Sequence, residues 1–228
     1  MKKSLSAAAG VAFAAAFRAL KILRPDRPIH PTGVALTGTI ERRGNAGSGI
    51  QWIDSPGTDT VSARLSRSLG MPPRWPDILG LALRIATEAG PADVLLASTG
   101  MAWPGRMMLT AHRYVSSSKL TSLMPYKGSR GPVLLAARPE VAGKVLPATP
   151  DAFRAALAAG TWTLGLYYAR PLGRWTRFGT LALTLDTKKA DLSTRFDPLR
   201  HALPGAGTYG WAGRLREPSY EAARRPVS

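Results

Sequence analysis

The chain has 228 residues, 45% of them hydrophobic, which suffices for one sizeable core and makes one domain the default. It has no cysteine, which excludes disulfides, thiol nucleophiles and cysteine-ligated metals, and its three histidines are too far apart in sequence to suggest a zinc site. A net charge of +17 attracts nucleic acid, anionic membranes or acidic ligands, but the charges are spread out and not interleaved with aromatic residues, so we expect no specific nucleic-acid binding.

Residues 1–25 are predicted to form an N-terminal amphipathic helix. The uncharged run 4–17 is too short to span a membrane, which needs about 20 apolar residues. Phe13, Phe17 and Leu20 recur at helical spacing beside basic residues. Three interpretations stay open: a helix packed on the body, a helix that lies on an anionic membrane surface through residues 5–23, and an export signal. The expected location is cytoplasmic, with peripheral membrane attachment or export as the alternatives.

Most of the remaining chain reads as short strands separated by turns. Apolar residues alternate or run continuously in 34–42, 60–67, 78–86, 93–97, 132–137, 161–170 and 177–187, with a short return strand at 50–53. Turns are expected at 44–49, 55–59 and 70–76, where glycine and proline gather.

Few helices are predicted. One covers 149–160, because Thr149 can cap it, Pro150 suits the first turn and Gly160 can end it. The segment 101–130 is expected to give a strand and then a helix at 117–124, and a short helix is expected at 217–225. Many short strands with few helices indicate an α+β fold, an antiparallel sheet or barrel with helices added.

The strand at 60–67 carries two polar residues on one face. Arg64 and Ser66 point one way, whereas Val61, Ala63 and Leu65 point the other. A polar strand face usually meets water; the alternative is that it lines a cavity. On the strand pattern alone, the water-facing interpretation is favoured and the cavity stays open as the alternative.

Four groups of residues follow one another in the first part of the chain: Arg27, His30 and Gly33; Arg64, Leu65 and Ser66; Asp77, Gly80, Ala82 and Arg84; and Asp93, Val94 and Leu95. They resemble motifs of the catalase-like haem proteins. That family has Arg-x-x-His-x-x-Gly before its first barrel strand, then Arg-aromatic-Ser, then Asp-x-x-Gly-x-Ala-x-basic, then Asp-Leu-Val. Order and spacing agree over about a third of the chain. The resemblance implies that residues 26–228 form one antiparallel barrel domain of the catalase-like kind, with few peripheral helices.

The resemblance also implies a distal site for peroxide beside a haem. His30 matches the histidine that shuttles the proton, and Ser66 matches the serine that steadies that histidine. The resemblance therefore favours the cavity, and we expect Arg64 and Ser66 to face inward on the same side as His30. Arg27 and Arg64 match arginines that meet the haem propionates, a role that suits guanidinium forks. The expected substrate is a peroxide or small hydroperoxide.

One departure concerns the asparagine that the family places over the iron. The nearest polar residue here is Ser98, preceded by Ala97. A serine has a shorter arm and one donor, so slow peroxidase or hydroperoxide chemistry is expected in place of catalase turnover.

The resemblance implies a tyrosine phenolate as the iron ligand. After Phe196-Asp197-Pro198, Arg216 stands four residues before Tyr220, as in the family's motif, and Tyr209 is the second choice. A cation near a phenol favours the phenolate. The alternative is a catalase-like fold without haem turnover, acting as a ligand-binding or membrane-peripheral basic protein.

Overall fold

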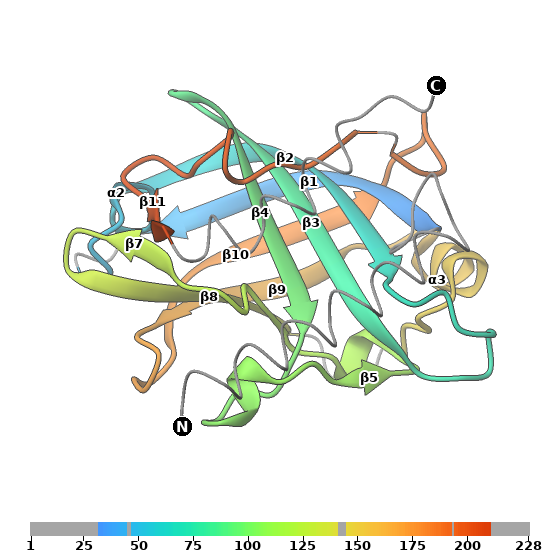
Figure 1. The fold of residues 1–228 in the computed structure, drawn as a ribbon. Coiled ribbons are helices and arrows are strands. Elements are labelled where there is room, and N and C mark those ends of the chain that lie inside the picture. The colour runs from blue at the N-terminus through green and yellow to red at the C-terminus, as the bar shows by residue number, and fades with distance from the viewer. Residues whose placement is uncertain (1–31, 45–46, 141–144, 193, 211–228) are drawn as a thin grey trace, which may run out of the picture.

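The computed structural model of the chain describes residues 32–44, 47–140, 145–192 and 194–210 (Figure 1). The strands are β1 (Gly33–Arg43), β2 (Pro56–Arg67), β3 (Asp77–Thr87), β4 (Gly90–Ser98), β5 (Ala111–His112), β6 (Leu120–Thr121), β7 (Tyr126–Gly128), β8 (Gly131–Pro139), β9 (Trp162–Ala169), β10 (Thr176–Leu185) and β11 (Gly207–Thr208). The helices are α2 (Gln51–Asp54) and α3 (Pro150–Leu157), with single 3₁₀ turns at Gly105–Met107 and Val115–Ser117.

Eight strands close into an antiparallel barrel. Their order is β8-β6-β4-β3-β2-β1-β10-β9, and pairing of β8 with β9 joins the two ends. The short strands β5, β7 and β11 lie outside this ring. The expected fold class, an antiparallel barrel with few helices, is confirmed.

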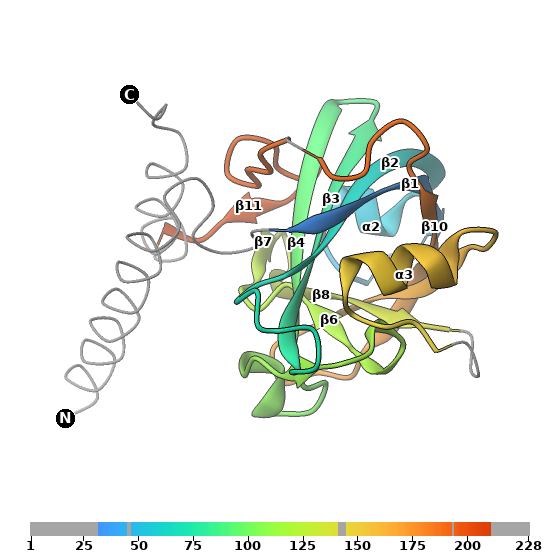
Figure 2. The same ribbon diagram turned by 90° about the vertical axis from the view of Figure 1, so that its right-hand side faces the viewer.

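The barrel interior is an apolar core, since each wall strand turns alternate side chains inward. The two helices lie at opposite ends of the barrel, and α3 crosses the end that faces the viewer in Figure 2. From α3, Phe153 meets Trp162 edge-on at a ring-centroid distance of 5.6 Å, and from α2, Trp52 meets Phe178 in the same way at 5.8 Å. Complete burial of a side chain such as Phe153 contributes roughly 1.5–3 kcal/mol to stability.

Several expected elements need correction. Residues 51–54 are helical, and the turn expected at 55–59 belongs to β2, whose pairing with β1 extends from Ser66 back to Pro56. No helix forms at 117–124; Leu120 and Thr121 instead bridge β4 and β8 and complete the barrel wall. At 56–59 and at 120–121, pairing with neighbouring strands outweighs local preference.

Some of the remaining predictions fall within the described residues and others outside them. The long strands and the helix after Thr149 are confirmed, although the helix ends at Leu157 and Thr149 makes no side-chain capping bond. The helices expected at 5–23 and 217–225 lie outside the described residues. Within the described part of the chain, no helix has the length and apolar character needed to cross a membrane.

Candidate functional site

The polar residues of β2 lie on the outer face of the barrel. Val61, Ala63 and Leu65 belong to the apolar core, so the alternate residues Arg64 and Ser66 point away from it. The alternation was predicted, but the expectation that Arg64 and Ser66 face inward is wrong, because the interior is filled by apolar side chains. Both residues are nevertheless only 6% exposed, so they do not face bulk water.

Strand register aligns the outward-facing residues of β1–β4 in rows across the barrel wall. The first row is Gly33, Ser66, Gly80 and Ala97, and the second is Ala35, Arg64, Ala82 and Leu95. The third row is Thr37, Ser62, Arg84 and Asp93. We call these three rows the outer face of β1–β4. Ala82, Leu95 and Ala97 are half-buried, and the β3–β4 part of the outer face is mostly apolar; we call it the floor.

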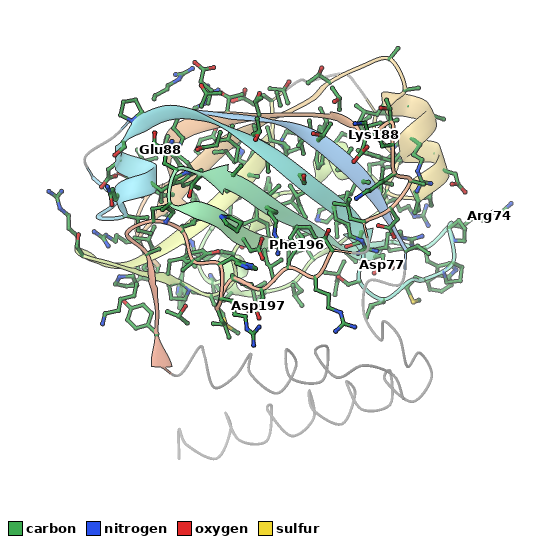
Figure 3. The ribbon with its side chains drawn as sticks, turned by 90° about the horizontal axis from the view of Figure 1, so that it is seen from above. Arg74, Asp77, Glu88, Lys188, Phe196 and Asp197 are labelled. Carbon is green, nitrogen blue, oxygen red and sulfur yellow. The ribbon has the colours of Figure 1, made fainter. Side chains whose placement is uncertain are left out.

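A segment that follows β10 crosses this face. We call residues 186–192 and 194–206 the strap; it carries Phe196 and Asp197 over the sheet (Figure 3). The backbone N–H of Ala35 donates to the carbonyl of Ala190 at 3.0 Å, and the N–H of Asp93 donates to the carbonyl of His201 at 2.8 Å. The strap therefore adds backbone hydrogen bonds to β1 and β4.

Arg64 joins β2 to the strap. Its Nε and Nη2 donate to Oδ1 and Oδ2 of Asp191 at 2.6 and 2.9 Å. The same carboxylate accepts the N–H of Gly33 at 3.0 Å. A Cβ at Gly33 would stand 2.7 Å from the Arg64 guanidinium carbon, so only glycine leaves room for this pair.

Arg84 on β3 and Asp93 on β4 form a second ion pair, to which the strap hydrogen-bonds. Arg84 Nε and Nη2 donate to the two Asp93 oxygens at 2.8 and 2.7 Å, and Nη2 also donates to the carbonyl of Arg195. Asp93 Oδ2 lies 2.9 Å from His201 Nδ1 and accepts the N–H of Asp197 at 2.7 Å.

Titration of this cluster reflects burial and pairing. Burial by itself would raise the pKa of Asp93. Hydrogen bonds from Arg84, Asp197 and His201, together with the positive charge of Arg84, outweigh this effect, so the pKa of Asp93 lies below its usual value. The hydrogen bond to Asp93 raises the pKa of Arg84. The sequence did not predict that His201 belongs to this cluster, because it lies 108 positions from Asp93 along the chain.

Ser66 and Ser98 are not brought together. The Ser66 hydroxyl lies on the outer face, where it donates to the carbonyl of Gly80 at 3.4 Å. Ser98 is fully buried and points inward with Val94 and Leu96; its hydroxyl donates to the carbonyl of Thr110 at 2.5 Å and accepts the N–H of Leu79 at 2.9 Å. Ala97 takes the outer position. The placement expected for Ser98, over a bound ligand, therefore does not match its geometry.

Several expected site residues lie outside the described residues: Arg27, His30, Arg216 and Tyr220. Tyr209, the second choice as iron ligand, directly follows β11 and is half-buried. In the described part of the chain, no group of three or more His, Asp or Glu side chains could hold a metal ion.

A hollow of about 440 Å³ continues the outer face toward the β3–β4 hairpin. Thr37, Ser62 and Arg84 of the third row line it, together with Thr60 and Thr87. Its polar groups are therefore hydroxyls beside one guanidinium.

Comparison with known proteins identifies the fold. No family model matches the sequence, and no curated protein matches it. A solved bacterial catalase is 13% identical in sequence, with a TM-score of 0.56. The match covers 90% of this chain and 60% of that catalase. A fungal catalase is 14% identical with a TM-score of 0.67, covering 88% of this chain and 59% of the catalase. Catalase A from Saccharomyces cerevisiae is also 14% identical, with a TM-score of 0.66 and coverages of 88% and 61%.

The chain has a catalase-like fold, as its motifs predicted. It spans about 60% of the length of these catalases.

The described residues can be tested against the haem that this fold implies. The small residues Gly80, Ala82 and Ala97 of the floor suit one side of a planar apolar ring, and guanidiniums beside them suit carboxylates. Arg64 and Arg84 already hold Asp191 and Asp93, so haem carboxylates would compete with these partners. The floor fits a haem, whereas its two arginines fit the haem carboxylates only if Asp191 and Asp93 release them, and Ala97 adds no polar group above the floor.

Proposed function

We propose that this catalase-fold chain binds haem against the outer face of β1–β4 and supports slow peroxide-dependent oxidation instead of rapid catalase turnover. The observation that carries the proposal is the row Gly33, Ser66, Gly80 and Ala97, which presents small side chains and one hydroxyl on the outside of a catalase-like barrel. A planar ligand can approach the backbone closely at the Gly80 and Ala97 end of the row, because at Gly33 the Arg64 guanidinium already fills that space.

Binding and orientation are assigned to residues of this chain. Arg64, with Arg27, would pair with the haem carboxylates, and Tyr220 would be the iron ligand, its phenolate favoured by Arg216. Bound haem supplies a redox-active iron. The iron ligand and the two partners outside the described residues are proposed from the sequence resemblance.

Proton movement is assigned to His30. A neutral imidazole can take a proton from one peroxide oxygen and return it to the other, and the Ser66 hydroxyl would orient that ring. On the described part of the outer face, the place of a second donor is taken by the methyl group of Ala97. One donor fewer supports slow oxidation.

Haem titration tests the proposal directly. Wild type, Tyr220→Phe and Tyr209→Phe are titrated with haem and followed by the Soret band, and the loaded proteins are assayed for oxygen release and for peroxide-dependent oxidation of an organic donor. We expect wild type and Tyr209→Phe to bind haem alike and Tyr220→Phe to bind it more weakly with a changed spectrum. If Tyr220→Phe matches wild type, Tyr220 is not the ligand. If none of the three binds haem, the haem proposal is wrong.

The second candidate is a catalase-like fold that binds another acidic or apolar ligand without haem turnover. The two carboxylates that already neutralise Arg64 and Arg84 weigh against haem and other acids and favour an apolar ligand. Absence of haem binding, with binding of an apolar ligand at this face, would select this candidate. Attachment to an anionic membrane through residues 5–23 is compatible with both functions.

A further inference from the structure

Large exposed apolar side chains gather on one side of the described molecule. Trp75 and Trp103 are 60% and 61% exposed, and Met108, Leu109 and Leu172 are 60%, 46% and 75% exposed. Monomeric soluble proteins rarely expose such side chains together, and a patch of this kind marks an interaction surface. The proposed function leaves these residues unused.

Three loops that carry these residues lie side by side. β5 pairs with the start of β3, which places segment 99–114 beside loop 69–76. Arg106 Nη1 donates to the carbonyls of Arg170, Pro171 and Gly173, which holds turn 170–175 against the same segment. Both ribbon views place these loops along the lower side of the barrel (Figures 1 and 2). We call loops 69–76, 99–114 and 170–175 the lower surface.

The lower surface has a defined shape. Arg106 is 5% exposed, and its guanidinium stacks on Trp175 at 5.1 Å from the ring centroid. The indole N–H of Trp175 donates to the carbonyl of Met101 at 2.9 Å. These anchors hold the loop that presents Trp103 and Met108, so the exposed side chains are displayed by a fixed backbone.

The charge of the lower surface is entirely positive. No Asp or Glu occurs between Asp93 and Glu140, nor in residues 69–76 or 170–175. Arg74, Arg113 and Arg174 are exposed in these loops, and Arg74 extends away from the barrel (Figure 3). The natural partner of such a surface is anionic and accepts indole and aliphatic side chains over a broad area.

We propose that the lower surface docks on an anionic lipid membrane. Tryptophan favours the boundary between headgroups and acyl chains, because its ring is apolar and its N–H is polar. Each Lys or Arg near an anionic bilayer adds to the affinity, and the attraction is screened by salt. This surface belongs to the barrel itself and is distinct from residues 5–23.

Vesicle flotation of the full-length protein tests the docking. The vesicles are phosphatidylcholine alone or phosphatidylcholine mixed with phosphatidylglycerol. The variants are Trp103→Ser with Met108→Ser, and Arg74→Glu with Arg113→Glu. The matched control is Lys188→Glu with Lys189→Glu, which changes net charge equally at exposed positions in the strap.

We expect binding to the mixed vesicles that falls with added salt, and little binding to the neutral ones. In the double variant Arg74→Glu, Arg113→Glu, each lost cation should weaken partitioning of the protein onto the mixed vesicles by about fivefold or more. The control Lys188→Glu, Lys189→Glu should keep most of its vesicle binding. Equal loss in both charge variants would mean that net charge alone acts, and it would overturn the proposal.

Brominated lipid distinguishes the lower surface from residues 5–23. Brominated phosphatidylcholine in the mixed vesicles should quench the fluorescence of the wild type, and Trp75→Phe with Trp103→Phe should remove most of that quenching while the protein still floats. Flotation without such quenching would assign binding to another segment. Absence of flotation would indicate that the lower surface binds a protein partner and not a membrane. Either result contradicts membrane docking by the lower surface.

Discussion

Arg64 on β2 and Asp191 on the strap form two parallel hydrogen bonds, Nε to Oδ1 at 2.6 Å and Nη2 to Oδ2 at 2.9 Å. The pair joins positions 127 residues apart, and one of its oxygens also accepts the N–H of Gly33. It therefore ties the start of β1, the end of β2 and the strap together. It also controls whether Arg64 can serve a bound acid.

Asp191→Asn should lower stability and strengthen haem binding. The neutral amide weakens two charge-assisted bonds, and we expect a loss of about 1–3 kcal/mol in the free energy of unfolding, since Asp191 is partly exposed. Without the competing charge, the guanidinium can pair with a haem carboxylate. Urea unfolding and haem titration measure the two effects. Unchanged haem affinity would mean that Arg64 does not meet the haem acids.

Ser98→Ala should affect stability and leave peroxide chemistry unchanged. The buried N–H of Leu79 would lose its acceptor, at a cost of about 1–3 kcal/mol in unfolding free energy. Because Ser98 points inward, the peroxide-dependent rate per bound haem should equal that of wild type. A rate loss at equal haem occupancy would restore Ser98 to the site. Ser62→Ala, at an exposed hydroxyl of the outer face, is the control for stability.

Stability should fall in acid because of Asp93. Folding lowers the pKa of Asp93 below its ordinary value of 3.8. Its contribution to the free energy of unfolding is therefore complete above pH 3.8 and is lost as the pH falls through the lower pKa of the folded state. Urea unfolding from about pH 6 to about pH 3 should show this loss, and Asp93→Asn should flatten the curve at its acid end. Asp151→Asn, at a fully exposed carboxylate, should leave the curve's shape unchanged. An unaltered acid slope in Asp93→Asn would refute the assignment.

His30→Ala should slow peroxide-dependent oxidation by about two to four orders of magnitude, the usual worth of general acid–base help. The measurement compares initial rates at equal haem occupancy. His112→Ala is the matched control, because His112 lies on β5 with its Nε2 bonded to Thr110 and away from the outer face. Equal rates for His30→Ala and wild type would remove His30 from the mechanism.

Much of this architecture follows from local sequence pattern. The alternation in 60–67 separated Arg64 and Ser66 from Val61, Ala63 and Leu65, because side chains in a strand change face at every residue. The same rule applied to β4 places Ser98 with Val94 and Leu96 and turns Ala97 outward. Strand alternation therefore indicates an inward Ser98 from sequence alone, whereas sequence distance from the expected asparagine position does not define the face.

The tertiary structure alone decided which face of β2 is inside and what covers the other. Alternation defines two faces without saying which one the closed barrel encloses, and closure depends on β8 meeting β9 across the ring. Asp191, which pairs with Arg64, and His201, which contacts Asp93, lie on the strap, more than 100 residues away in sequence. Such contacts depend on the path of the whole chain, so a pattern read within one strand carries no information about them.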